Sequence, residues 1–191
     1  MGKGRLEAFS DGVIAIIITI MVLELKVPQG ADLAALRPLI PVFLGYLLSF
    51  TFVGIYWNNH HHLLHVVQRV NGNILWANLF LLFCLSLVPF VTAWMGENHF
   101  STIPVATYGV VLLLCAIAFT ILARLLVAHH GEDSPLAKAI GSDHKGKISL
   151  LLYAVAIPLA FMDPRISLAI YVTVAVIWFL PDRRIERLVA K

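Results

Sequence analysis

Histidines gather at one place in the sequence, in the run His60–His62 and at His65. Imidazole is the commonest side-chain ligand for metals, and the i, i+4 spacing of His61 and His65 places both on one face of a helix. A membrane metalloenzyme needs several such pairs, however, and the sequence offers only one more, His129 with His130. We therefore predict no metal site, no cofactor and no enzymatic activity. This run leaves two alternatives open. One is a metalloenzyme, and the other, for the outer histidines, is a solvated helix end.

Two acidic residues interrupt the most N-terminal apolar segment, Asp11 and Glu24. An ionisable group at membrane depth is costly unless it is paired or hydrated, so such a group is a candidate for function. Glu24 lies close to Lys26 at the end of the segment, where water can solvate it. Asp11 can act simply as a first-turn acid with Ser10 as the helix cap, or it can take part in a buried network.

Polar residues at the end of the second apolar segment could supply the partners of Asp11. Trp57, Asn58 and His61 carry hydrogen-bond donors, and Arg5 carries positive charge. An unpaired carboxylate at that depth would take up a proton, so Asp11 requires such partners. We expect a network that fixes the first helix against the second. Its predicted members are Arg5, Phe9, Ser10, Asp11, Trp57, Asn58 and His61.

The chain that must position these residues has the composition of a membrane protein. Of its 191 residues, 60% are hydrophobic and 13% are charged, and the mean hydropathy is +0.87. Soluble domains carry roughly a quarter charged residues. The composition excludes a disordered chain, and the net charge of +3 is too small to indicate a nucleic-acid partner. We expect one domain, residues 1–191, without a soluble appendage.

Six apolar segments predict an all-α fold with six transmembrane helices. They are Phe9–Leu25, Leu39–Trp57, Ile74–Met95, Pro104–Ala123, Ile148–Met162 and Ile166–Leu180. A bilayer core of about 30 Å needs about 20 helical residues, and the last two segments are shorter, which leaves a re-entrant pair as an alternative. The residues Asp163-Pro164-Arg165 predict a tight hairpin between them. We also expect the second helix to continue to Val70 and residues 124–146 to form a mobile loop.

The distribution of basic residues predicts the orientation in the membrane. With six spans, both termini lie on the same side, together with the second and fourth connections. Eleven of the 14 lysines and arginines fall on that side, and only Lys26, Arg37 and Arg165 fall on the other. Because basic residues mark cytoplasmic loops, we expect a multi-pass protein of the lipid bilayer with both termini in the cytoplasm.

One face of the first helix carries a stripe of mainly aliphatic side chains. Its members, at spacings of four and three, are Arg5, Phe9, Gly12, Ile16, Thr19 and Leu23, with Ile20 beside them. Such a stripe is normally core or lipid-facing surface. Several copies around an axis would instead form narrow hydrocarbon rings, which can gate ions by dewetting. Thr19 would then be the only polar side chain in the narrow zone, where its hydroxyl could ligand a partly dehydrated cation.

Two of these motifs resemble a known family. The residues Arg5-Leu6-Glu7-Ala8-Phe9-Ser10-Asp11 match the R-x-x-x-F-S-D signature of the transmembrane protein 175 family. This family contains the lysosomal potassium channels of animals and their shorter prokaryotic relatives. The run Trp57-Asn58-Asn59-His60-His61 is similar to the pattern that follows the family's second helix. Six spans, this chain length and cytoplasmic termini agree with the prokaryotic form.

The resemblance implies a homotetrameric potassium channel of a prokaryotic plasma membrane, in which the first helix of each subunit lines a central pore. By position, it implies constrictions at Ile16 and Leu23 and a polar layer at Thr19, with Gly12 and Ile20 as pore-lining flanks. It places Arg5 and Asp11 in the packing network and implies passive flux of potassium ions. The alternative from another class is a secondary, proton-coupled transporter that uses Asp11 and the histidines as a relay.

Overall fold

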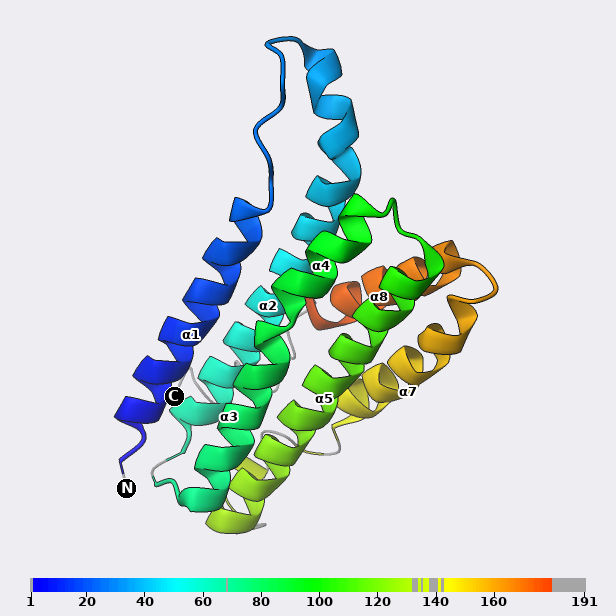
Figure 1. The fold of residues 1–191 in the computed structure, drawn as a ribbon. Helices are drawn as coiled ribbons and strands as arrows, with labels where there is room; N and C mark the ends of the chain where they lie inside the picture. Colours follow the sequence, from blue (N-terminus) through cyan, green and yellow to red (C-terminus); the bar gives the residue numbers. More distant parts are fainter. Residues whose placement is uncertain are drawn as a thin grey trace.

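A computed structural model describes residues 2–67, 69–131, 134, 136–137, 141 and 143–179. In chain order its helices are α1 (Gly4–Leu23), the 3-10 helix η1 (Leu33–Leu39), α2 (Ile40–His65), α3 (Gly72–Ser86), α4 (Val88–Glu97), α5 (Thr102–His130), α7 (His144–Leu159) and α8 (Pro164–Phe179). In Figure 1, α1 lies at one edge of the bundle, and the start of α2 extends beyond the other helices. The fold is all-α, as the apolar segments predict.

Within the part of the chain that the structure describes, these elements form six helical segments, because η1 leads directly into α2 and α3 is followed at once by α4. Four of these segments are long and apolar enough to cross a membrane. They are Gly4–Leu23, Leu33–His65, Gly72–Glu97 and Thr102–His130. The other two, α7 and α8, have 16 residues each, which is fewer than the roughly 20 that a full perpendicular span needs. The chain is therefore a multi-pass membrane protein with a shorter C-terminal helix pair.

Several helix ends differ from the predicted boundaries for identifiable reasons. The second helix ends at His65 and not at Val70. At this end the Lys3 Nζ donates to the carbonyl oxygens of Leu64 and His65, at 2.8 Å each. The third segment is interrupted at Leu87, because Pro89 lacks the amide hydrogen that would continue the helical bonding pattern.

The fourth helix is longer than its apolar segment. It continues to His130 and ends where Gly131 takes a φ of +90°, a conformation that suits glycine. Residues 124–130, which we expected to begin a mobile loop, are therefore helical. Part of the remaining predicted loop lies outside the described residues.

The centre of the bundle is α5, which packs against α3, α4, α7 and α8. A buried chain of hydroxyl groups joins it to two further helices: Tyr108 donates to Ser49 at 2.9 Å, and Ser49 donates to Thr92 at 2.6 Å. This direction follows because Thr92 gives its own hydrogen to the carbonyl oxygen of Val88. These bonds link α2, α4 and α5 to one another and do not involve α1.

The last two helices form the predicted tight hairpin. The Asp163 carboxylate accepts a hydrogen bond from the Arg165 amide at 2.9 Å and so caps the start of α8. Further along, the buried Ser167 hydroxyl donates to the carbonyl oxygen of Ala156 on α7 at 2.7 Å. Figure 1 shows this pair lying against α5, on the side of the bundle away from α1.

Candidate functional site

The two faces of α1 differ in what they contact. One face is buried against α2, α3 and α4, and its side chains are Leu6, Ser10, Ile14, Ile17 and Met21. The opposite face carries the predicted stripe, and there Ile16 is 58% exposed and Leu23 is 77% exposed. Phe9, Gly12, Thr19 and Ile20 are exposed as well. Within one chain, the stripe is thus an uncovered surface and not part of the core.

Thr19 is held in a defined orientation on this surface. Its hydroxyl donates to the carbonyl oxygen of Ile16 at 2.9 Å. A threonine hydroxyl has a single hydrogen, so the oxygen lone pairs that remain can only accept. Thr19 therefore presents an acceptor at the level between Ile16 and Leu23, which is the chemistry that a cation ligand requires.

Beside the stripe, an apolar groove separates α1 from the α3–α4 segment. Ile16, Ile17 and Ile20 line one wall, and Phe90 and Trp94 belong to the opposite wall. Two acidic residues, Glu24 and Glu97, also line the groove. The C-terminal half of α1 is therefore only partly covered by its own chain.

The far end of this groove carries an ion pair. The Lys26 Nζ lies 2.6 Å from the Glu97 Oε1, and this contact links the residues just after α1 to the end of α4. The hydrogen bond and charge of Glu97 raise the pKa of Lys26 above its ordinary value. Both side chains are exposed, so the pair adds little to the stability of the fold and serves mainly to position the end of α1 beside the end of α4.

Toward the opposite end of α1, Asp11 accepts a hydrogen bond from Trp57, which is one of its predicted donors. The Trp57 Nε1 donates to the Asp11 Oδ1 at 3.0 Å, across the α1–α2 contact. His61 does not reach the carboxylate but stacks on the Trp57 indole, with ring centroids 6.0 Å apart. Asp11 and Trp57 both lie at the surface, so the contact is a clamp at the edge of the helix pair.

A second, buried network holds the same region, and it includes two residues that the sequence reasoning missed. Asn78 of α3 donates through Nδ2 to the Ser10 Oγ at 2.9 Å, and its Oδ1 lies 2.7 Å from the His60 Nε2. An amide oxygen only accepts, so His60 Nε2 carries the hydrogen and donates. Ser10 completes the chain by donating to the carbonyl oxygen of Leu6 at 2.8 Å. Ser10, His60 and Asn78 are each almost fully buried.

The sequence did contain a signal for Asn78 and His60, the two residues that were missed. Asn78 is an amide inside an otherwise apolar segment, and a buried amide needs partners. His60 follows Trp57 by three residues, as His61 follows it by four, so both histidines lie near the Trp57 side of the helix. The structure selects His60 for the buried network because it faces α3, whereas His61 is exposed.

Two predicted members stay outside the network that forms within one chain. Arg5 and Asn58 are exposed, and neither side chain makes a hydrogen bond or ion pair to any residue that the structure describes. Arg5 lies on the same exposed stripe as Ile16, so helical geometry turns it away from Asp11. Phe9 is also on that stripe and exposed. Within one chain the structure thus gives the Arg5 side chain no ion pair with Asp11, and a role for Arg5 in the network stays a prediction.

The histidine run does not converge on one point. His60 points to Asn78, while His61 and His65 stay at the surface with ring centroids 6.1 Å apart. His129, of the second pair, instead accepts a hydrogen bond from Asn71 at 3.3 Å. Among the residues that the structure describes, no group of three histidine, cysteine or acidic side chains could hold a metal ion.

Comparison with known proteins places these features in context. The family model described as "Endosomal/lysosomal potassium channel TMEM175" matches residues 5–89, which include α1, the histidine run and Asn78. A potassium channel of Chryseobacterium sp. is 57% identical over 187 residues, covering 98% of this chain and 97% of that protein. A potassium channel of Streptomyces collinus is 34% identical over 87% of this chain and 86% of that protein.

A solved structure has the same fold. It is the crystal structure of a lysosomal potassium-selective channel TMEM175 homolog from Chamaesiphon minutus. The TM-score is 0.82 at 33% sequence identity, and the match covers 93% of this chain and 96% of that chain. The likeness extends over nearly the whole chain and is not confined to the signature region.

Proposed function

The chain belongs to the TMEM175 family and is an ion channel and not an enzyme, and from this premise we propose that it conducts potassium ions passively across a membrane. Relatives that cover nearly the whole chain are named potassium channels, which supports the choice of ion. The plasma membrane of a prokaryote, with both termini in the cytoplasm, is the location that the distribution of basic residues favours.

The observation that carries the proposal is the uncovered aliphatic stripe of α1. A long apolar surface that its own chain leaves open marks an interface or a path. We propose that four copies assemble with this face toward a common axis. Ile16 and Leu23 then form two hydrocarbon rings, and a ring that is narrow enough expels water and stops ions until it widens.

Between the two rings, Thr19 supplies the polar layer. Its accepting lone pairs replace part of the water that a cation loses on entering the narrow zone. An aliphatic constriction offers no ring of backbone carbonyl oxygens to replace the whole hydration shell. Selectivity for potassium over sodium should therefore be modest. Gly12 and Ile20 flank the path.

The inner network has a positioning role in this proposal. The contacts of Asp11 with Trp57, and of Ser10 with Asn78, set the angle at which α1 leaves α2 and α3. That angle decides how closely four Ile16 side chains approach one another. Glu24, near the other end of α1, would raise the local cation concentration at the pore mouth.

The test is potassium flux into proteoliposomes that contain only this protein. A channel gives passive, uncoupled flux that continues without a proton gradient and does not saturate at low turnover. A proton-coupled transporter using Asp11 and the histidines would need the gradient. Flux that disappears when the proton gradient is collapsed would overturn the channel proposal.

A further inference from the structure

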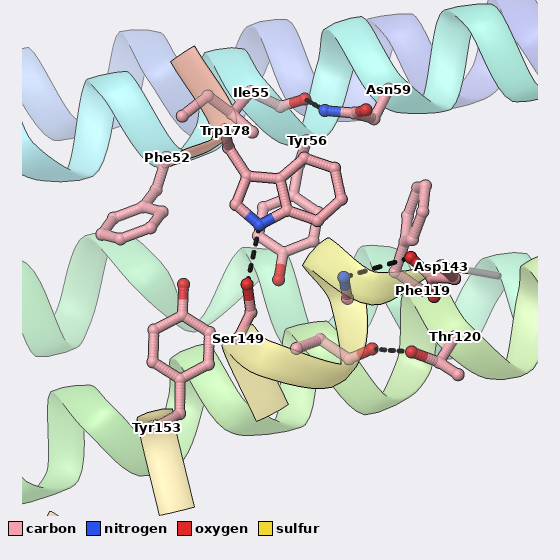
Figure 2. Close-up of a pocket in the computed structure, with 12 residues that line it drawn as sticks. Phe52, Ile55, Tyr56, Asn59, Phe119, Thr120, Asp143, Ser149, Tyr153 and Trp178 are labelled. Carbon is pink, nitrogen blue, oxygen red and sulfur yellow. Dashed lines mark hydrogen bonds between the residues drawn. The ribbon is translucent and has the colours of Figure 1, made fainter. Parts of the chain in front are cut away.

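Two hollows in the bundle differ in how far their own chain fills them. The hollow between α2, α5, α7 and α8 is packed with aromatic rings and leaves a cavity of only about 40 Å³ (Figure 2). There the Trp178 Nε1 donates to the Ser149 Oγ at 2.8 Å, and Phe52 is buried. The groove between α1 and the α3–α4 segment leaves about 730 Å³. This groove therefore has room for side chains that its own chain does not supply.

An aromatic ridge runs along the exposed side of the first part of α2. Phe43 and Phe50 are 50% and 43% exposed, and they are seven residues apart, which is nearly two helical turns. The Tyr46 ring links them, with ring centroids 6.3 Å from Phe43 and 6.0 Å from Phe50. Trp57 follows Phe50 by another seven residues, and it donates to Asp11 of α1. The ridge of Phe43, Tyr46 and Phe50 therefore lies beside α1, which covers it only in part.

The ridge lies at the same level of the bundle as the groove. Ser49, the neighbour of Phe50, is hydrogen-bonded at 2.6 Å to Thr92, which is in the part of α4 that forms the groove wall. Nearer the end of α4, Gly96 packs so closely against the residue before Phe43 that a Cβ would not fit. Copies related by an axis along the membrane normal keep each residue at its own level. The ridge of one copy can therefore meet the groove of another.

The groove and the ridge flank α1 on opposite sides. Ile16, Ile17 and Ile20 line the groove, whereas α2 contacts α1 at Asp11, which helical geometry places on the other side of the helix. When one face of α1 points to a common axis, each flank meets the opposite flank of the next copy, as in any cyclic assembly. On the basis of the assembly proposed above, we propose that the aromatic ridge of one copy fills the groove of the next copy.

The chemistry of the groove suits this occupant. Phe90 and Trp94 stack on the groove wall with ring centroids 6.0 Å apart, and Phe90 is 65% exposed. Aromatic rings pack well against other aromatic rings, in offset or edge-to-face contacts. The phenylalanines of the ridge supply such rings, and the aliphatic wall of α1 supplies the apolar surface on the other side.

Charge at one end of the groove favours the same pairing. Lys26 neutralises Glu97, so Glu24 leaves this end with negative charge. Arg37 of η1 lies beyond the ridge at the corresponding end of α2, is exposed, and forms no ion pair with a residue that the structure describes. Opposite charges across an interface favour one register over others. A second copy, and not lipid, therefore matches the groove in shape and in charge.

The test is disulfide crosslinking between two differently tagged copies that are expressed together. One copy carries Phe50→Cys and the other carries Ala93→Cys in the groove, so a disulfide formed with copper phenanthroline joins two chains and doubles the mass on a gel. We expect about tenfold more product than with Val110→Cys in place of Phe50→Cys, because a disulfide needs Cα atoms within roughly 7 Å. Val110 is 40% exposed and lies near the level of Phe50, since Tyr108 is hydrogen-bonded to Ser49.

The controls decide between the possible occupants. Each single variant expressed alone should give no product, because the native Cys84 and Cys115 are buried. Lipid in the groove would leave both mixed pairs without product. That result, or equal yields from Phe50→Cys and Val110→Cys, would overturn the proposal.

A second pair tests the other end of the ridge and decides the question if Phe50→Cys does not fold. Phe43→Cys with Trp94→Cys should crosslink as well, and adding Arg37→Glu should lower the yield through repulsion from Glu24. Passive potassium flux in proteoliposomes of the same proteins separates the two proposals. Flux without crosslinks would overturn the interface alone, and crosslinks without flux would overturn the channel proposal alone.

Discussion

The two halves of α1 are held in different ways. The N-terminal half, which is the inner half in the proposed orientation, is fastened by directional contacts: Lys3 to the end of α2, Ser10 to Asn78 and Asp11 to Trp57. The C-terminal half, the outer half in that orientation, packs with apolar side chains on one face only, leaves Ile16 and Leu23 exposed, and is followed by the exposed ion pair of Lys26 with Glu97. One end of the helix is therefore fixed in its own subunit, and the other end presents bare hydrocarbon.

This difference suggests how the proposed rings of Ile16 and Leu23 can be positioned precisely although the rings themselves contain no polar side chain. Hydrogen bonds fix direction and distance, whereas apolar contacts fix little more than proximity. Placing most of the hydrogen bonds at one end lets the protein set the tilt of α1 and still keep the proposed Ile16 and Leu23 rings themselves aliphatic. We call the inner half of α1 the fixed half and its outer half the bare half, and the two can be tested separately.

The largest effect is expected in the buried part of the fixed half. Asn78→Leu leaves the His60 Nε2 hydrogen and the Ser10 oxygen without their partner, and each stranded buried group costs roughly 1–3 kcal/mol. We expect the free energy of unfolding to fall by about 3 kcal/mol, as measured by titration with a denaturing detergent. Asn73→Leu is the control, since Asn73 is exposed on the same helix. Equal stability of the two variants would argue against the network.

The next largest effect is expected in the bare half. Ile16→Asn places a hydrating group in the proposed constriction and should raise basal potassium flux about tenfold, which corresponds to a barrier lower by about 1.4 kcal/mol. Single-channel recording in planar bilayers measures this change. Val22→Asn makes a similar substitution at an exposed position off the stripe and should leave the current unchanged. An unaltered current in Ile16→Asn would remove Ile16 from the gate.

A smaller effect is expected at the exposed clamp of the fixed half. Trp57→Phe keeps an aromatic ring but removes the donor to Asp11, and we expect the free energy of unfolding to fall by about 1 kcal/mol. Trp76→Phe is the matched control, because Trp76 is 74% exposed. A loss as large as that of Asn78→Leu would mean that Asp11 is the principal anchor.

The smallest effect is expected at the outer ion pair. Lys26→Gln should leave thermal stability unchanged within error, because exposed pairs contribute little. The pKa of Lys26 is raised, so whatever the pair contributes is present at neutral pH and is lost only as pH rises through that higher value. A clear drop in the melting temperature at neutral pH would show that the Lys26–Glu97 pair does stabilise the outer half of α1.

The all-α fold and the family could be predicted from the sequence. Long apolar segments can satisfy their backbone groups in a bilayer only as helices, so the helical segments follow from hydropathy, and the signature from Arg5 to Asp11 indicated the family that the comparisons confirm. The break at Pro89 and the extension of α5 to His130 were missed. Hydropathy reports burial in lipid and not the hydrogen bonds that end a helix.

The candidate site was predicted in part. The exposed stripe follows from helical periodicity, which requires only one helix, and the structure leaves Ile16, Thr19 and Leu23 uncovered as a pore surface requires. The partners of the inner network involve three helices at once. Trp57 was among the expected donors to Asp11, whereas Arg5 and Asn58 were expected in the network and remain at the surface.

The sequence by itself determined which residues share a helix face, because the turn of an α-helix is the same in every protein. It therefore defined the hydrocarbon stripe of α1 and the polar character of its inner end. Only the tertiary structure decided that Asn78 lies between Ser10 and His60, and that Ser49 lies between Tyr108 and Thr92. Those pairings depend on how far each helix is rotated and shifted against its neighbours, and side-chain packing across the whole bundle sets that rotation.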